Sequence, residues 1–410
     1  MPKHTANAWV PRTIEAALSA PPPALQLFPV WLLLGPRQVG KTSVLVRCAG
    51  SDRQYVNLDD LAVRARANAD PALFARDLRP PLLIDEIQYA PALLSAVKVL
   101  ADAKPGPGAV WITGSQSFEV MRGVQETLAG RVALLELQGL ADEERQPRPA
   151  TPDDVFASVL RSRFPALHRV DDVDARELYL DGYVRTYLER DVRELLGVQK
   201  RREFERFVRL CALRTGQLVN YDDLGRDAGV SATTAKEWLA VLADSFLVML
   251  VPPWHANASK RLVKSHKLYF LDAGLAAWLS GWRTLDQVRY GPQAGALLET
   301  HVLAQIVAAL RHRAREARVH FWRDRDGREV DFLVETRSGT LPIEVKVGTP
   351  SGLAPLARIR EPSWRDGLVV SLLQRPGETA ACTADWTAIS LADLPYWLLG
   401  TTASTEGNGA

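Results

Sequence analysis

Residues 28–45 read Phe28-Pro29-Val30-Trp31-Leu32-Leu33-Leu34-Gly35-Pro36-Arg37-Gln38-Val39-Gly40-Lys41-Thr42-Ser43-Val44-Leu45. The apolar run Val30–Leu34 predicts a buried strand, and it leads directly into a segment that fits the pattern G-x-x-x-x-G-K-S/T. Glycines let backbone N–H groups turn inward around phosphate oxygens, and a helix that starts after such a loop points the positive end of its dipole at the same anion. The stretch therefore predicts a phosphate-binding loop between a strand and a helix.

The expected ligand of this loop is ATP with Mg²⁺. We expect Lys41 to reach the β- and γ-phosphates, and the Thr42 hydroxyl to take one place on the metal ion. The expected nucleotide contacts are Gly35, Pro36, Arg37, Gln38, Val39, Gly40, Lys41, Thr42 and Ser43. A glycine-rich turn with a surface lysine is the alternative, which the strand and helix context disfavours.

A second short apolar run, Leu82-Leu83-Ile84, ends in the two carboxylates Asp85 and Glu86. Such runs are typical of buried strands in a parallel sheet, where ligands bind outside the carboxyl ends of the strands. We expect Asp85 to hold Mg²⁺ through water and Glu86 to orient and deprotonate the attacking water. Phosphoryl transfer depends mainly on positioning and charge neutralisation, so few residues are needed.

Two further polar positions are candidates for catalysis. Thr113 or Ser115, after the predicted strand 109–113, could sense the γ-phosphate, although ordinary turn chemistry explains both residues equally well. Arg131 could be an arginine finger, which would imply a ring or a dimer if a neighbouring copy supplied it. A surface arginine is the alternative.

The motifs together resemble the AAA+-like branch of the P-loop ATPases, because a strand lies between the two nucleotide motifs and Glu86 stands beside Asp85. The strings Asp85-Glu86-Ile87-Gln88, Thr113-Gly114-Ser115 and Leu128-Ala129-Gly130-Arg131 look like those of the bacterial and archaeal AAA-type ATPases with a C-terminal domain of unknown function. The resemblance covers nearly the whole chain. It implies an α/β fold with a P-loop NTPase sheet, followed by further domains.

Composition sets the broad class. The chain has 410 residues, of which 47% are hydrophobic and 24% charged, and its net charge is +2. These values predict a globular protein of two to three domains and leave nucleic-acid binding to local patches. Three widely spaced cysteines disfavour a disulfide framework and a zinc site. The most apolar N-terminal stretch, 25–34, is too short to span a bilayer, so we expect a cytoplasmic protein without membrane contact.

Changes in composition and pattern predict the domain boundaries. The expected segments are an ATPase domain (1–140), a linker with a helical segment (141–200), a winged-helix domain (201–284), a restriction-endonuclease-like domain (285–400) and a disordered tail (401–410). In the helical segment, Tyr183, Tyr187 and Arg190-Asp191 match the string of the same family, and we expect them to dock this helix on the ATPase core.

The winged-helix prediction depends on helix-turn-helix spacing between 220 and 244, followed by two strands. Its third helix would present Thr233, Thr234 and Lys236, and basic residues in and beside the wing would suit phosphate contacts. These are Lys260, Arg261, Lys264 and Lys267. Winged helices also serve as protein–protein modules and spacers, and a reader helix with one lysine is poor for base readout.

The C-terminal part carries a helix glutamate, a strand aspartate and Glu-x-Lys on the next predicted strand. These residues, Glu299, Asp331, Glu344 and Lys346, are the constellation of the restriction-endonuclease-like fold. The three carboxylates would bind Mg²⁺ or Mn²⁺, and Lys346 would lower the pKa of the attacking water or steady the phosphate. Such domains also persist as binding modules, because fold does not establish function.

Three functions stay open on the sequence alone. The leading one is a Mg-dependent, ATP-hydrolysing switch of the AAA+ type that acts on or near DNA, with a homo-oligomer as an option. The second is an ATP-gated, metal-dependent nuclease. The third is a non-catalytic ATP-binding protein that binds DNA or has a regulatory role.

Overall fold

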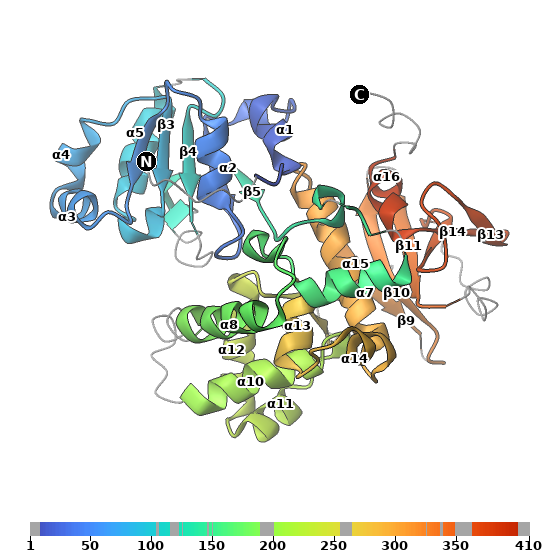
Figure 1. The fold of residues 1–410 in the computed structure, drawn as a ribbon. Coiled ribbons are helices and arrows are strands. Elements are labelled where there is room, and N and C mark those ends of the chain that lie inside the picture. Colours follow the sequence, from blue (N-terminus) through green and yellow to red (C-terminus); the bar gives the residue numbers. More distant parts are fainter. Residues whose placement is uncertain are drawn as a thin grey trace. The chain divides into compact units, whose positions relative to one another are not determined.

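The computed structural model describes residues 9–103, 106–114, 123–124, 126–145, 147–149, 151–188, 201–254, 265–324, 326–336, 339–348 and 363–400. The chain folds into two compact units (Figure 1). Unit 1 comprises Met1–Leu140 together with the short segment Arg311–Arg315, and unit 2 comprises Ala141–Leu310 and Glu316–Ala410.

Unit 1 is built on a five-stranded sheet in the order β2-β3-β4-β1-β5, and its paired strands are all parallel. Every residue of β1, β3 and β4 is buried, as expected where both faces of a parallel sheet are covered. The strands are β1 (Val30–Leu34), β2 (Gln54–Asn57), β3 (Leu82–Asp85), β4 (Val110–Thr113) and β5 (Val132–Glu136). The α/β sheet predicted for this part of the chain is confirmed.

Short helices connect these strands. Their bounds are α1 (Ile14–Ser19), α2 (Lys41–Cys48), α3 (Leu61–Ala69), α4 (Pro71–Ala75) and α5 (Leu93–Asp102). On one face of the sheet, α1 and α2 share a core with Trp31 and Trp111, whose rings stack at 5.7 Å. Ala314, from the inserted segment, packs against the same core. A piece of chain that is distant in sequence therefore completes unit 1.

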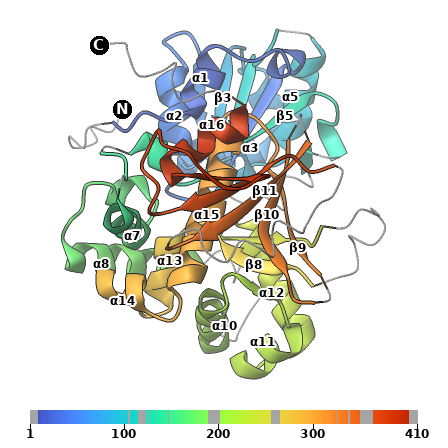
Figure 2. The same cartoon turned by 90° about the vertical axis from the view of Figure 1, so that its right-hand side faces the viewer.

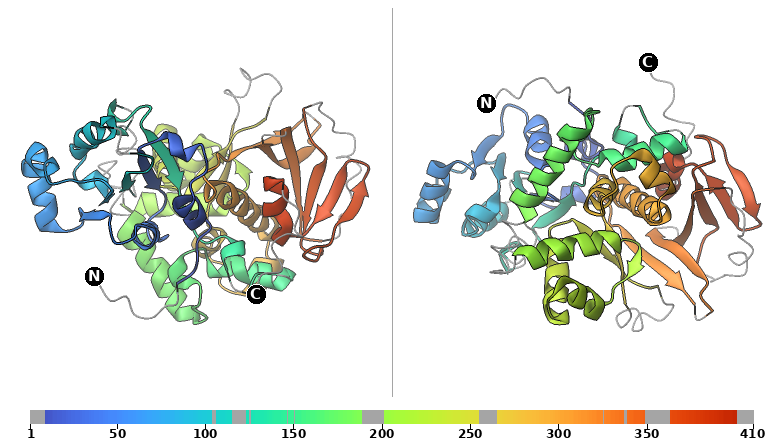
Figure 3. Two further views of the ribbon diagram at one scale, coloured as in Figure 1. Left: turned by 90° about the horizontal axis from the view of Figure 1, so that it is seen from above. Right: turned by 60° about the horizontal axis from the view of Figure 1, so that its bottom comes forward.

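Unit 2 contains most of the helices that the structure describes. They are α7 (Pro152–Arg161), α8 (Val173–Tyr183), α10 (Arg201–Leu213), α11 (Tyr221–Ala228), α12 (Ala232–Asp244), α13 (Ala273–Leu279), α14 (Leu285–Tyr290), α15 (Ala294–Arg311, whose last residue belongs to unit 1) and α16 (Leu394–Leu399). Figure 3 shows α10, α11 and α12 as one green-to-yellow cluster. Trp238 of α12 holds it together, since its ring meets Phe204 at 5.2 Å and Phe207 at 5.5 Å, both edge-on.

Two sheets complete unit 2. The smaller has the order β6-β8-β7, with β6 (Gln217–Leu218), β7 (Val248–Val251) and β8 (Lys267–Phe270). The larger has the order β13-β14-β12-β11-β10-β9, with β9 (Arg318–Arg323), β10 (Glu329–Thr336), β11 (Gly339–Lys346), β12 (Gly367–Ser371), β13 (Ala380–Thr383) and β14 (Trp386–Ile389). The long helix α15 runs across one face of the larger sheet (Figure 2). One apolar core joins the two sheets, and Tyr269 of β8 lies 5.5 Å from Phe332 of β10.

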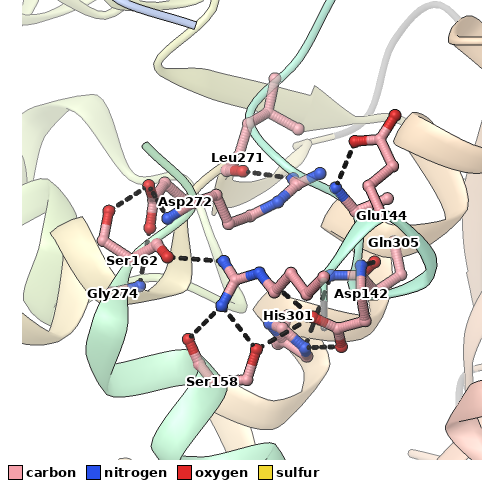
Figure 4. Close-up of polar contacts among 12 residues, drawn as sticks. Asp142, Glu144, Ser158, Ser162, Leu271, Asp272, Gly274, His301 and Gln305 are labelled. Atoms are coloured by element: carbon pink, nitrogen blue, oxygen red, sulfur yellow. Dashed lines mark hydrogen bonds and ion pairs between the residues drawn. The ribbon is translucent and has the colours of Figure 1, made fainter. Parts of the chain in front are cut away.

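A buried polar network fixes the start of unit 2 against α15 (Figure 4). Asp142 accepts a hydrogen bond from Ser158 at 2.9 Å and lies 2.7 Å from Nε2 of His301, and its backbone N–H donates to Gln305 at 2.8 Å. Burial alone would raise the pKa of the Asp142 carboxyl, but His301 and Arg145 outweigh it and hold the pKa well below its usual range. Because each partner is buried, this network is a structural anchor.

None of the helices that the structure describes combines the length and apolar character needed to cross a membrane.

Candidate nucleotide site

The phosphate-binding loop follows β1 and ends at the first residue of α2. Gly40 has a φ of +93° and Gly35 a φ of +144°, conformations that favour glycine. A Cβ on Gly35 would lie 2.0 Å from the carbonyl oxygen of Leu137, the residue after β5. The loop therefore depends on glycine both for its turn and for the close approach of a neighbouring segment.

Lys41 is the first residue of α2, and its side chain is buried against the loop. Its ammonium donates hydrogen bonds to the carbonyl oxygens of Gly35 at 2.9 Å and Pro36 at 2.8 Å. Only 6% of the residue is exposed. These carbonyls keep the positive charge at the loop, where an anion can replace them as its partner.

Asp85, the last residue of β3, is the hub of the site. One carboxylate oxygen accepts from the hydroxyls of Thr42 at 2.8 Å and Thr113 at 2.5 Å, and the other accepts from the Tyr55 hydroxyl at 2.9 Å. A hydroxyl and a carboxylate are oxygen ligands of the kind that Mg²⁺ prefers, so this donor set fits the ion that the sequence predicts.

Glu86 has a left-handed backbone, with a φ of +59°. Its N–H donates to the Thr113 hydroxyl at 3.0 Å, and its carboxylate accepts from the Gln88 side chain. A positive φ is uncommon for a residue other than glycine, and such residues cluster at functional sites. Thr113, one of two predicted sensor candidates, thus links Asp85 and Glu86, whereas Ser115 lies outside the described residues.

Two residues near Asp85 were missed by the sequence analysis. Burial, and then the charge of Asp85, raise the pKa of the Tyr55 phenol. Burial also raises the pKa of Asp59, with further contributions from Glu86 and Asp85. Their signal in the sequence is their place on and just after β2, the strand next to β3, because parallel strands end at a common edge.

Arg131 lies at the end of the sheet where the parallel strands begin, opposite the end that carries the phosphate-binding loop. It precedes β5, its carbonyl accepts from Val30 N–H at 3.2 Å, and its guanidinium pairs with Asp102 at 2.5 Å. The loop begins after Leu34, about four residues or roughly 13 Å further along the parallel strand direction. The structure therefore does not bring Arg131 to the loop of its own chain, and a finger supplied to a second copy stays a prediction.

Arg12 lies just before α1 and supports the phosphate-binding loop. Its guanidinium donates to the carbonyl oxygens of Val39, within the loop, and of Gln138, after β5, both at 2.7 Å. Only 5% of Arg12 is exposed. Arg12 belongs to no recognisable motif, so its role could not be predicted from the sequence.

The C-terminal candidates lie together in unit 2. Asp331 on β10 faces Glu344 on β11, whose carboxylate is 3.4 Å from the Asp331 nitrogen, and Lys346 donates to Glu344 at 2.7 Å. Burial, and then the charge of Asp331, raise the pKa of Glu299 to about 8 and of Glu344 to about 7. Within the described part of the chain, no three His, Cys, Asp or Glu side chains gather closely enough to hold a metal ion. Metal binding there stays a prediction.

Lys267 is not the exposed wing cation that the sequence predicts. It is the first residue of β8 and only 6% exposed, and it pairs with Glu329 of β10. Strand pairing on both sides of β8 turns its side chain into the core of unit 2. The three other wing cations, Lys260, Arg261 and Lys264, lie outside the described residues, as do Arg190 and Asp191.

Comparison with protein families defines the class. Residues 28–145 match a family described as "AAA domain", which agrees with the parallel sheet and the loop described above. Residues 153–286 and 294–393 match two families described as domains of unknown function, DUF8612 and DUF4143. Unit 1 is thus an AAA-type P-loop domain.

Comparison with whole proteins identifies the family of the full chain. It is 34% identical over 331 residues to "Uncharacterized protein Rv2008c" of Mycobacterium tuberculosis and, equally, to "Uncharacterized protein Mb2031c" of Mycobacterium bovis. The match covers 80% of this chain and 73% of each relative, so the chain belongs to their family. A solved structure, "Structure of Drosophila ORC bound to DNA", is matched at a TM-score of 0.22 and 11% identity over 66% of this chain and 94% of that one.

Proposed function

We propose that this protein is a Mg-dependent, ATP-hydrolysing switch. The observation that carries the proposal is the convergence of Lys41, Thr42, Asp85 and Thr113 at the carboxyl edge of a parallel sheet. Ligands of open α/β sheets bind at this edge. The match of residues 28–145 to an AAA domain supports the same reading.

Each residue has a role in the proposed reaction. The loop amides and Lys41 hold the triphosphate, and Lys41 exchanges its two carbonyl partners for phosphate oxygens. Thr42 and Asp85 would hold Mg²⁺, which when bound neutralises negative charge on the phosphates. Glu86 orients the attacking water and accepts its proton, while the Thr113 hydroxyl ties the Asp85 carboxylate to the backbone N–H of Glu86.

Two variants test the roles. Lys41→Ala is expected to weaken Mg-ATP binding by at least about 100-fold in calorimetry, because the loop loses its buried cation. Lys98→Ala, on the exposed face of α5, is the matched control. Glu86→Gln is expected to bind Mg-ATP normally and to hydrolyse it roughly 100-fold or more slowly, the usual effect of losing a general base. Hydrolysis by Glu86→Gln at the parent rate would show that Glu86 is not the base.

We also propose that α10–α12 and the β6-β8-β7 sheet form a winged helix that contacts DNA. Thr233 and Lys236 are exposed on α12, and Ser231 caps this helix by accepting from Thr234 N–H at 3.1 Å. A salt titration of DNA binding by the full chain tests the proposal, because each phosphate contact adds to the salt dependence. Affinity that does not change with salt would favour the alternative, a protein–protein module.

The second candidate function is a metal-dependent nuclease in unit 2. The facing pair Asp331 and Glu344, with Lys346 on the same strand, favours it. Incubation of plasmid DNA with Mn²⁺ and either the parent or Lys346→Ala would decide the matter. Cleavage by the parent that is lost in Lys346→Ala would establish this function, and equal DNA integrity in both samples would show that the chain alone does not cleave DNA.

A further inference from the structure

Lys267 extends from the smaller sheet of unit 2 toward residues of the larger sheet and α15. Its ammonium pairs with Glu329 and lies 3.5 Å from the Tyr269 hydroxyl, which donates to Glu299 at 3.1 Å. The positive charge of Lys267 also acts on Asp331 and Glu299. A cation contributed by the predicted winged helix therefore faces the carboxylates predicted to bind a metal ion.

Strand pairing holds Lys267 in this position. β8 is the central strand of its sheet, and Lys267 is opposite Leu218 of β6 on one side and Val251 of β7 on the other. Tyr269, two residues along the same strand face, packs its ring against Phe332 of β10. A Cβ on Gly216, just before β6, would lie 3.6 Å from the Glu299 carboxylate, an ordinary van der Waals distance, so this end of the small sheet lies beside Glu299.

Four carboxylates and two lysines make up this cluster. The carboxylates are Glu299 of α15, Glu329 and Asp331 of β10, and Glu344 of β11, and the cations are Lys267 of β8 and Lys346 of β11. Buried carboxylates are stable only when paired or protonated, and a buried ammonium needs the same compensation. A divalent ion at these carboxylates would stand next to the Lys267 ammonium and be repelled by it.

We propose that Lys267 is the resident cation of this carboxylate cluster, and that the cluster takes up no divalent metal ion while β8 holds Lys267 there. The inference bears on the nuclease-like candidate function, for which it supplies a built-in block. Metal entry would require β8 to withdraw from β10. ATP hydrolysis in unit 1 plays no part in the argument.

The test is Mn²⁺ binding to the full chain without nucleotide, measured by electron paramagnetic resonance of free Mn²⁺. Lys267→Met is expected to bind one Mn²⁺ at least about 100-fold more tightly than the parent, because the carboxylates lose their cation, keep their oxygens and can move together around the metal ion. The double variant Lys267→Met with Asp331→Asn is expected to lose this gain. Lys267→Arg keeps the charge and is expected to behave as the parent does.

Two results would overturn the proposal. One is a parent protein that itself binds one Mn²⁺ and loses it on Asp331→Asn. The other is a folded Lys267→Met that gains no Mn²⁺ binding. If Lys267→Met does not fold, Lys267→Gln, which keeps a polar group for Glu329, takes its place in the same titration. Since the readout is metal binding, failure of ATP turnover or of DNA cleavage would not affect the result.

Discussion

Glu299→Gln should change the pH dependence of the stability of unit 2. The Glu299 carboxyl accepts from the Tyr269 hydroxyl at 3.1 Å, and burial followed by the charge of Asp331 raises its pKa from 4.5 to about 8. Between these two values the folded state keeps a proton that the unfolded state has lost. Stability therefore falls as pH rises through this range, and the loss is complete above the folded pKa.

The size of the effect follows from the linkage relation. A pKa of about 8 implies a loss of roughly 2 kcal/mol between about pH 6 and pH 8, at about 1.4 kcal/mol per pH unit while the proton stays bound. Gln is uncharged at every pH and can still accept from the Tyr269 hydroxyl. The variant should lose this part of the pH slope and be more stable than the parent at alkaline pH.

Urea unfolding followed by tryptophan fluorescence at several pH values measures the slope. Glu237→Gln, which changes an exposed carboxyl on α12 of the same unit, controls for the change in net charge. The parent and this control should lose stability together as pH rises, and Glu299→Gln should lose about 2 kcal/mol less, because Glu344 still titrates in the variant. A parent that keeps its stability from pH 6 to pH 8.5, or a Glu299→Gln variant with the parent's slope, would refute the reasoning.

Three further predictions concern single contacts. Gly274→Ala should destabilise unit 2 by about 3 kcal/mol or more, because the new Cβ would lie 2.4 Å from backbone atoms of Ser162. Gly295→Ala, with open space around its Cβ, should leave the stability unchanged, and thermal unfolding of the two variants measures the difference. Arg12→Met should weaken ATP binding about tenfold in calorimetry, since two buried carbonyls lose their donor and the loop loses its tie, and normal affinity would contradict this. Thr113→Val should lower the rate of hydrolysis by roughly 10- to 100-fold with little change in affinity, and an unchanged rate would remove its role between Asp85 and Glu86.

The strand, loop and helix of the candidate nucleotide site could be predicted because their information is local in the sequence. Strand, loop and helix succeed one another between Val30 and Cys48, and the rule that parallel strands end at a common edge brings Asp85 to the loop. The same rule, applied to Arg131, shows that a residue before a strand lies at the wrong edge. Arg12 was not predictable, since its role depends on two carbonyl oxygens distant in the sequence.

The position of Lys267 was not predictable for a different reason. A lysine next to three other basic residues and at the start of a short strand has the pattern of an exposed cation. Its burial depends on the packing of one sheet against another, which gives it Glu329 as a partner. Sequence periodicity describes which face of a strand a residue occupies, but it does not say whether that face meets solvent or a set of carboxylates.

The segment that follows α15 belongs to unit 1 and supports its phosphate-binding loop. His312, the residue after α15, accepts a hydrogen bond from Gln138 N–H at 3.0 Å through Nε2. The carbonyl of Gln138 in turn accepts from Arg12, which also holds Val39 in the phosphate-binding loop. Arg12, Gln138 and His312 therefore form one chain of hydrogen bonds within unit 1, in which a residue distant in sequence completes the support of the loop.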